Sequence, residues 1–506
     1  MALVKKGLPV TMLDYGLELE TERREKLSRL AAVSKNEWKR QDLSFLKDDI
    51  QAEWKQVGVD LKRAYGSVFP FRAPEKVETE NRGVKFYPSY AKGGLSNVWG
   101  ALMLPYMQKD IEDWPVRAEE LSPSYEAVLS FMKSFSAKKD DLEALFPLHT
   151  PVPDSLRPSR QISELFSDLE RHKPELKKKG FIFGSSRVAV KGSECVYCGL
   201  CVYGCPYGLI YNSSSTLKIL MSSSNFHYQG GVCVKKLIEK DGHVEIIAEA
   251  GGEETSFQAK RVYLAAGVLS SARILMESLS IEEGITIQDS QFFSFPIIRQ
   301  KATPGAMTEE TYTLAQIFIE LLDPEISKHT AQLQVYPYNE LYTQAISRFF
   351  GPAHILFKPF EKQALERMMV MFGYLHSKDS SAMNLRLEKH NGASKLVVES
   401  RLNPAAKTAI KKIVRKIQKN ARPFGIFPFF PSVNIAPPGT SFHAGGSFPM
   451  SASPQDFQSD TLGRPMGLKR IHVVDASVFP SVPSTTITFT VMANAYRIGN
   501  LHGDTD

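Results

Sequence analysis

The sequence predicts a mixed α/β (α+β) fold, in which helices pack on a parallel sheet and a second, sheet-based part forms a separate domain. Three observations predict it. The apolar segment 10–13 follows a tight turn and ends at Asp14, as a buried parallel strand does. The apolar residues 261–264 run through Ala265-Ala266-Gly267 into a helical pattern, which is a second strand-to-helix junction. Between residues 285 and 440, strand patterns alternate with one long basic helix.

Composition is that of an ordinary globular protein. Among 506 residues, 62 Lys or Arg and 55 Asp or Glu give a formal charge of +7, and 43% of residues are hydrophobic. A chain of this length and composition can bury a large core, which excludes disorder, a solenoid and a mini-protein. The basic excess is small and no dense basic face interleaved with aromatic residues is found, so nucleic acid is not expected as a partner. No run of 18 apolar residues occurs, so no transmembrane segment is predicted.

The remaining elements follow from local periodicity. Charged residues at helical spacing predict solvated helices between 17 and 65, and small residues after 486 predict a closing helix. The expected helices are the turn at 2–6, the segments within 17–65, and 115–135, 271–278, 404–420 and 486–499. The expected strands are 10–13, 232–234, 244–247, 261–264, 368–372, 396–398 and 470–474.

Asp14 stands at the C-terminal end of the first predicted strand, where a βαβ dinucleotide site places the carboxylate that binds ribose hydroxyls. An Asp in this position can equally be a turn residue or an N-cap. No Gly-x-Gly occurs anywhere in the chain. The sequence is therefore expected to lack the first strand, the glycine loop and most of a helix, on the order of 20 to 30 residues of a βαβ unit, and Met1 could be internal to a longer reading frame.

Four of the five cysteines form one motif. Cys195, Cys198, Cys201 and Cys205, followed by Pro206, have the spacing C-x2-C-x2-C-x3-C-P. This spacing places thiolates on a tight loop that can surround an iron–sulfur cluster. Three alternatives stay open: a zinc site, a disulfide pair, and a loop without metal that is kept for packing.

A third group of polar residues lies near the C-terminus. His443 sits in a loop of small residues, Thr440 to Met450, which would let a cofactor or substrate approach the backbone. The predicted strand 470–474 is followed by Asp475 and, after Thr486, by a helix N-terminus whose free N–H groups can face an anion or a polarised carbonyl. A histidine that occurs alone is more often structural than catalytic. The catalytic hypothesis for His443 therefore depends on the neighbouring motif that contains Asp475 and Thr486.

Taken together, these segments resemble the glucose–methanol–choline (GMC) family of flavoprotein oxidoreductases along nearly the whole chain. Four segments occur in family order. They are Val10 to Gly16, Gly93-Gly94 through Gly100-Ala101, Ala265-Ala266-Gly267 with its helix, and the closing signature formed by His443-x-x-Gly446-Ser447-x-x-Met450 and Asp475-Ala476-Ser477-x-x-Pro480. Trp99 is similar to the sugar-oxidising branches. Branches with a covalent flavin have a histidine where Val98 stands.

The resemblance implies a Rossmann-like FAD-binding domain, discontinuous in sequence, plus a sheet-based substrate domain. The implied boundaries are 1–284 for the FAD-binding domain with a cysteine-rich loop at 193–212, 285–435 for the substrate-binding domain, and 436–506 for the return to the FAD domain. FAD is expected to be non-covalent. The implied cofactor-binding residues are Asp14, Gly93, Gly94, Ser96, Asn97, Trp99, Gly100, Val234, Ala265, Ala266, Gly267, Asp475, Ala476 and Ile487.

The resemblance also implies a dehydrogenase that oxidises a hydroxyl of a sugar or other alcohol by hydride transfer to flavin N5, with His443 as base. Thr486 stands where the family usually has His or Asn, which weakens or alters that chemistry. Electrons could leave through a cluster bound by the cysteines to a redox protein or quinone. The alternatives are an oxidase that uses oxygen and a non-catalytic or electron-transfer relative. Clustered thiols favour a reducing cytoplasm.

Overall fold

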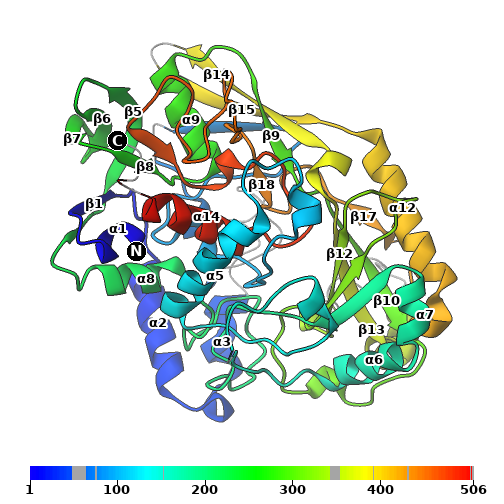
Figure 1. Ribbon diagram of the computed structural model, residues 1–506. Coiled ribbons are helices and arrows are strands. Elements are labelled where there is room, and N and C mark those ends of the chain that lie inside the picture. The colour runs from blue at the N-terminus through cyan, green and yellow to red at the C-terminus, as the bar shows by residue number, and fades with distance from the viewer. Residues whose placement is uncertain are drawn as a thin grey trace.

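The computed structural model describes residues 1–47, 64–74, 77–151, 153–341, 343, 354–390, 393–429, 432–501 and 503. The chain folds into a mixed α/β structure with several sheets, as the sequence predicts (Figure 1). Two short parallel pairs lie in the first part of the molecule: β1 (Val10–Leu13) with β4 (Phe226–Gln229), and β8 (Val262–Leu264) with β19 (Ile471–Val473). Beside them lies an antiparallel meander of β5 (Val232–Glu239), β6 (Val244–Ala250) and β7 (Glu253–Ala259).

Five helices accompany these strands. α14 (Thr488–Asn500) packs against α5 (Ala118–Met132) and also touches α1 (Ala2–Lys5). α9 (Val268–Leu279) follows β8 and packs on β5, and α8 (Ser213–Leu220) precedes β4. In Figure 1, α14 and α5 lie between the meander and the larger sheet.

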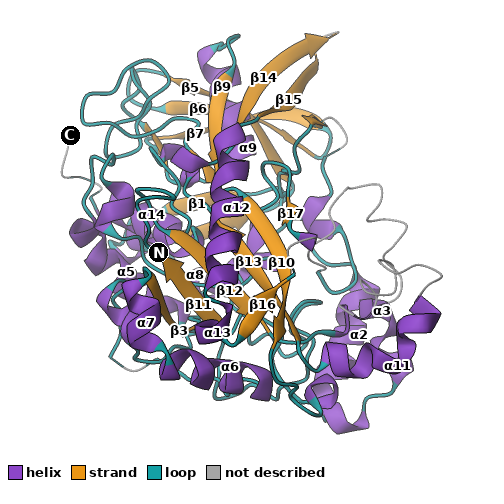
Figure 2. Ribbon diagram, turned by 90° about the vertical axis from the view of Figure 1, so that its right-hand side faces the viewer, coloured by secondary structure: helices purple, strands orange, loops and turns teal. Residues whose placement is uncertain are grey.

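A seven-stranded antiparallel sheet forms the second part. Its strand order is β16 (Ile426–Pro428), β10 (Phe292–Arg299), β13 (Met368–Tyr374), β12 (Ala331–Tyr336), β11 (Ile317–Leu321) and β3 (Phe181–Ser185), and β17 (Asn434–Ile435) also pairs with β10. Its outer face is covered by α6 (Arg160–Arg171), α7 (Lys173–Lys178), α12 (Pro404–Lys419) and α13 (Ala421–Phe424), with α12 crossing the strands (Figure 2). α12 buries an apolar face that includes Ile410, Ile413 and Ile417, so the predicted basic helix lies with its lysines outward.

A five-stranded sheet joins the two parts, in the order β18 (Ala444–Gly445), β9 (Ile285–Asp289), β14 (Ala382–His390), β15 (Ala393–Arg401) and β2 (Glu78–Arg82). The predicted strand 396–398 belongs to this sheet, and not to the sheet that contains 368–372. β3, from before residue 284, pairs with β11 of the seven-stranded sheet. Strand patterns in sequence do not specify partners, because pairing depends on segments far away in the chain.

The helical segment near the N-terminus consists of α2 (Thr21–Ala32) and α3 (Arg40–Lys47), and the rest of the predicted helical region, 48–63, lies outside the described residues. One further helix, α11 (His354–Leu365), precedes β13. None of the described helices combines the length and the apolar character needed to cross a membrane.

Candidate active site

The predicted flavin segments meet through backbone hydrogen bonds. Leu17 donates its N–H to the Tyr90 carbonyl at 2.9 Å, and Lys92 donates to the Leu17 carbonyl at 2.8 Å, which joins the end of β1 to the Gly93 turn. Asp14 Oδ2 accepts a hydrogen bond from the Tyr228 hydroxyl at 3.1 Å. Burial raises the pKa of Asp14, although hydrogen bonds from Tyr228 and from the backbone of Gly16 and Tyr15 partly oppose this. Asp14 therefore lies at the strand end as predicted. It also accepts hydrogen bonds from the backbone of the following turn, as the alternative interpretation of Asp14 as a turn residue expects.

The Gly93 to Gly100 turn is held in place by neighbours from another segment. Gly93 has a φ of 90°, and a Cβ there would meet Asn212 Oδ1 at 2.5 Å, so only glycine fits. Asn212 donates from its side chain to Asn97 Oδ1 at 2.7 Å, and the Trp99 indole N–H donates to the Tyr211 carbonyl at 2.9 Å. Ser96 donates to the Gly93 carbonyl. These contacts pin the turn onto residues 211–213, which follow the cysteine loop.

Asp475 connects the later turn to the closing signature. Its Oδ2 accepts from the Gly267 N–H at 2.9 Å and from the Ser271 hydroxyl, while Oδ1 accepts from the Ser477 N–H at 2.9 Å. Gly267 has a φ of 83° and is the N-cap of α9. Ala265, Ala266 and Gly267 are exposed at the end of β8. The bond from Gly267 to Asp475 joins residues that are 208 positions apart in the sequence. Asp475 thus ties the turn at Gly267 to the closing signature. Val234 is half-buried in β5 at the edge of the main core.

Replacing Asp475 with Asn is expected to destabilise this junction. The amide offers one acceptor oxygen and no charge, so at least one charge-assisted hydrogen bond to Gly267, Ser271 or Ser477 is lost. We expect a loss of about 1.5–3 kcal/mol in the free energy of unfolding, measured by urea denaturation. Asp456→Asn, at an exposed position, is the matched control and should leave the midpoint unchanged. An unchanged midpoint for Asp475→Asn would contradict the role of this carboxylate.

The loop that carries His443 is fixed from two sides. β18 pairs with β9, which places Ala444 opposite Asp289, and Ser290 donates its N–H to the His443 carbonyl at 2.9 Å. Gly446 donates to the Ala476 carbonyl at 3.0 Å, and the next residues of both segments continue this ladder. The imidazole of His443 stacks on the ring of Tyr374 from β13, with ring centroids 5.1 Å apart and planes at 26°. His443 therefore lies where the seven-stranded sheet meets the closing signature.

Thr486 lies buried immediately before α14. Its hydroxyl oxygen accepts the Leu104 N–H at 3.0 Å, so the oxygen is engaged and the hydroxyl hydrogen remains as a donor. Ile487 is the N-cap of α14 and makes no side-chain capping bond. The first N–H groups of α14 accordingly need partners from another source. This agrees with the predicted helix N-terminus after Thr486.

Sequence reasoning missed two residues that adjoin His443. Tyr374 contributes the stacked ring, and Asp289 lies one strand away with a fully buried carboxyl that accepts from the Ser441 hydroxyl at 2.9 Å. Burial raises the pKa of Asp289 to about 7. No motif contains either residue. The only sequence signal is Asp289 at the end of a strand pattern, and that signal does not predict burial.

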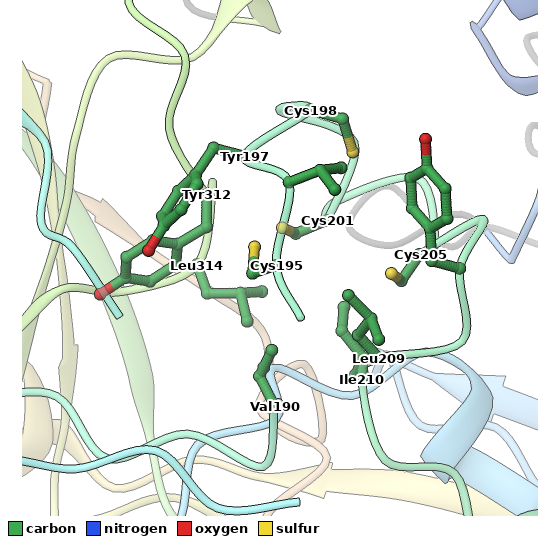
Figure 3. Close-up of a pocket in the computed structure, with 12 residues that line it drawn as sticks. Val190, Cys195, Tyr197, Cys198, Cys201, Cys205, Leu209, Ile210, Tyr312 and Leu314 are labelled. Atoms are coloured by element: carbon green, nitrogen blue, oxygen red, sulfur yellow. The ribbon is translucent and has the colours of Figure 1, made fainter. Parts of the chain in front are cut away.

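The four motif cysteines line a single cavity (Figure 3). The sulfur atoms of Cys195 and Cys205 point into the space that the loop surrounds, and Cys198 and Cys201 flank it. The rest of the wall is apolar or aromatic and consists of Val190, Val196, Tyr197, Tyr207, Leu209, Ile210, Tyr312 and Leu314. Tyr197 has a φ of 56° and Gly199 a φ of 74°, which bends the loop around the cavity. The cysteines, spaced over eleven residues in sequence, are thus brought together as the motif predicts.

Burial dominates the electrostatics of these thiols. Burial, together with neighbouring thiolates, raises the pKa of Cys198 to about 11 and of Cys201 to about 12. None of the described cysteines is in a disulfide, which removes the disulfide alternative for this structure. Over the described ranges, no group of three or more His, Cys, Asp or Glu residues is placed so that it could hold a metal ion. The structure therefore places the four thiols around one cavity, and it forms no metal-binding group among the described residues.

The comparisons with known proteins found a family model that matches part of the chain and a solved structure with a similar fold. The family model described as GMC oxidoreductase matches residues 381–495, which include His443, Asp475 and Thr486. This match covers the C-terminal part of the chain. The chain is similar in fold to a solved structure entitled "Crystal structure of pyridoxine 4-oxidase from Mesorbium loti", with a TM-score of 0.60, 13% identity, and coverage of 100% of this chain and 96% of that chain. No curated protein sequence matches the chain.

The resemblance to this family implies FAD, and the residues present fit such a cofactor. At the end of β8 the exposed Ala265-Ala266-Gly267 turn has open space, since a Cβ on Gly267 would meet nothing within 4 Å. A Cβ on Gly94 would also meet nothing within 4 Å. The uncapped start of α14 offers N–H donors of the kind that an anionic group binds. Two turns and one helix N-terminus, from three segments that are distant in the sequence, thus remain available to a bound nucleotide.

Proposed function

We propose that this protein is an FAD-dependent dehydrogenase that oxidises a hydroxyl group of a sugar or another alcohol. The observation that carries the proposal is the position of His443. It lies within the matched family region, it is stacked on Tyr374 from the seven-stranded sheet, and its loop is hydrogen-bonded to the Asp475 turn. The imidazole of His443 therefore lies next to the Asp475 turn, where the cofactor is expected, and next to the seven-stranded sheet, where the substrate is expected.

The proposed mechanism assigns a task to each of these residues. Non-covalently bound FAD supplies the acceptor of the hydride that leaves the substrate carbon. His443 accepts the proton of the substrate hydroxyl, and Tyr374 holds the imidazole ring in a fixed orientation. Thr486 presents its hydroxyl hydrogen toward a substrate oxygen, since its own oxygen already accepts from Leu104. Asp475 fixes the turn that contains Gly267, and N–H groups of the first turn of α14 would stabilise negative charge on the bound cofactor.

The test is spectroscopic. Purified protein should be yellow, and the flavin absorbance should bleach under anaerobic conditions when an oxidisable alcohol is added. Simple alcohols and monosaccharides form the first panel. Protein that remains colourless after incubation with excess FAD would favour the alternative, a relative that has lost alcohol oxidation. Rapid reoxidation of the bleached flavin by oxygen would favour an oxidase over a dehydrogenase.

We further propose that Cys195, Cys198, Cys201 and Cys205 hold an iron–sulfur cluster, which would supply an outlet for single electrons to a redox protein or quinone. The donor set of four thiols in an apolar cavity supports this. Free thiols also favour a reducing compartment, and we place the protein in the cytoplasm on that ground.

Iron and acid-labile sulfide should therefore co-purify with anaerobically prepared protein, in similar molar amounts. Cys201→Ser removes a thiol that lines the cavity and is expected to abolish most of the bound iron while flavin content stays unchanged. Cys233→Ser, in buried β5 outside the cavity, is the matched control and should retain the iron. Zinc without labile sulfide in the wild-type protein, or full iron in Cys201→Ser, would overturn the cluster proposal.

A further inference from the structure

α12 (Pro404–Lys419) carries almost all of the net charge of the chain. Its 16 residues include six Lys or Arg residues and no Asp or Glu. The whole chain has a formal charge of +7, so the remainder of the sequence is close to neutral. At physiological ionic strength, exposed charges are screened beyond about 8 Å. The charge of α12 therefore acts mainly on what lies directly against this helix.

The packing of α12 points this charge into solvent. Its apolar side chains, such as Ile410 and Ile413, are buried against the outer face of the seven-stranded sheet. In Figure 2, α12 crosses the front of that sheet and no described element lies over it. Lys416 is half-buried and pairs with Asp323, in the loop after β11. The other cations are exposed and form no ion pair in the described part of the chain; they are Lys407, Lys411, Lys412, Arg415 and Lys419.

The end of α7 (Lys173–Lys178) extends the positive surface. The three residues 177–179 are lysines, and all three are exposed. Lys416 Nζ lies 5.7 Å from the centre of the Phe181 ring, two residues after Lys179, so α7 and α12 meet here. Two exposed carboxylates lie nearby, that of Glu175 on α7 and that of Glu325, whose backbone carbonyl accepts from α12 at 3.0 Å. The exposed cations of α12 and of residues 177–179, which we call the basic surface, outnumber these carboxylates.

An exposed leucine stands at the start of α12. Leu402 is 72% exposed, the highest value among the large apolar side chains in the described part of the chain. The next residue fixes this turn, because Asn403 accepts from the Ala405 N–H at 3.0 Å and donates its own N–H to Ser381 Oγ at 3.2 Å. One exposed leucine is common on protein surfaces. At the end of a row of cations, however, it adds an apolar group that a lipid surface can bury.

The composition of the basic surface distinguishes between classes of anionic partner. Lysine is depleted in protein–protein interfaces, whose centres consist of aromatic, Met and Arg side chains, and all but one of these cations are lysines. Single-stranded nucleic acid stacks its bases on aromatic rings, and α12 contains none. Clusters of about four to eight Lys or Arg residues on a helix are typical of surfaces that bind anionic phospholipid headgroups. The basic surface therefore fits an anionic bilayer best.

We propose that the basic surface and Leu402 attach the protein to the surface of a membrane that contains anionic phospholipids. The lysines contact headgroup phosphates, and Leu402 enters the boundary between headgroups and acyl chains. α12 is about 24 Å long, so its exposed side can contact several headgroups at once. Its apolar side stays in the protein core, so the helix lies on the bilayer without crossing it. This attachment is independent of the proposed oxidation of an alcohol, and either proposal can fail without the other.

The test is sedimentation of the purified protein with lipid vesicles. Vesicles of phosphatidylcholine alone are compared with vesicles in which about one third of the lipid is phosphatidylglycerol. We expect binding to the anionic vesicles at about 0.05 M salt and release from them at about 0.5 M salt, because salt screens the attraction. Neutral vesicles should leave the protein in the supernatant. Free glycerol phosphate should not compete, because a single headgroup cannot replace a charged surface.

Two double variants locate the contact. Lys411→Gln with Arg415→Gln removes two exposed cations one helical turn apart and should weaken binding to anionic vesicles by about thirtyfold. Lys218→Gln with Lys260→Gln removes two exposed lysines outside the basic surface and is the matched control, which should bind as the unsubstituted protein does. Circular dichroism of both variants checks that the fold is kept. Leu402→Ser should weaken binding by about threefold or more at every salt concentration, because its contribution is apolar.

Three outcomes would contradict this proposal. Absence of binding to anionic vesicles, or equal weakening in the two double variants, would overturn it. Binding of polyglutamate or DNA that depends on Lys411 and Arg415, with vesicles left unbound, would assign the basic surface to an acidic macromolecule. Full affinity in Leu402→Ser would overturn the part of the proposal that concerns the apolar anchor.

Discussion

Replacing His443 with Asn should slow the anaerobic bleaching of the flavin by substrate by a factor of about 10² to 10⁴, while the protein keeps its flavin. Asparagine is polar and of similar size, so it can occupy the space next to Tyr374, but it cannot accept a proton from a hydroxyl group. The measurement is the first-order rate of absorbance loss after rapid mixing with saturating substrate. The loss should appear in this rate more than in the apparent substrate affinity, because proton transfer occurs in the reaction step.

His227→Asn is the matched control, since His227 is an exposed residue of β4 and lies outside the site. Its bleaching rate should equal that of the unsubstituted protein. A His443→Asn variant that retains the full rate would exclude His443 as the base and would move attention to Thr486. A variant that loses its flavin as well as its rate would indicate that the His443 loop supports cofactor binding.

Asp289 should make the free energy of unfolding fall as pH rises between about 4 and 7. The folded protein holds the Asp289 proton up to a pKa of about 7, whereas the unfolded chain releases it near 3.9. Over that window the unfolded state binds fewer protons than the folded state, so stability decreases with pH and becomes level above 7. A shift of this size corresponds to a contribution on the order of 4 kcal/mol.

The check is a pair of urea unfolding series at pH 5 and pH 8. Asp289→Asn cannot ionise, so its stability relative to the unsubstituted protein should be higher at pH 8 than at pH 5. Asp241→Asn, at an exposed turn, controls for a general change of charge. Its stability relative to the unsubstituted protein should be the same at pH 5 and pH 8. Equal pH dependence in Asp289→Asn and the unsubstituted protein would show that the carboxyl beside the His443 loop is not held in its protonated form.

Local elements were predicted well where periodicity was strong. The helices α9, α12 and α14 and the strands β1, β8 and β19 lie within a few residues of the predicted segments. Partners were not predicted. The strand pattern at 396–398 gave no indication that β15 pairs with β2, because β2 lies about three hundred positions earlier in the chain.

In the candidate site, too, some features could be predicted from the sequence and others could not. The residue types of the motifs at Cys195 to Cys205, at Gly267, and from His443 to Thr486 already indicated the chemistry, because thiols, glycines and an imidazole have few substitutes in those roles. The sequence alone determined that donor set. Only the tertiary structure decided that Tyr374 stacks on His443 and that Asp289 is buried beside it. The reason is physical: the pKa, orientation and hydrogen-bond satisfaction of a side chain depend on burial and on neighbours that chain order does not specify.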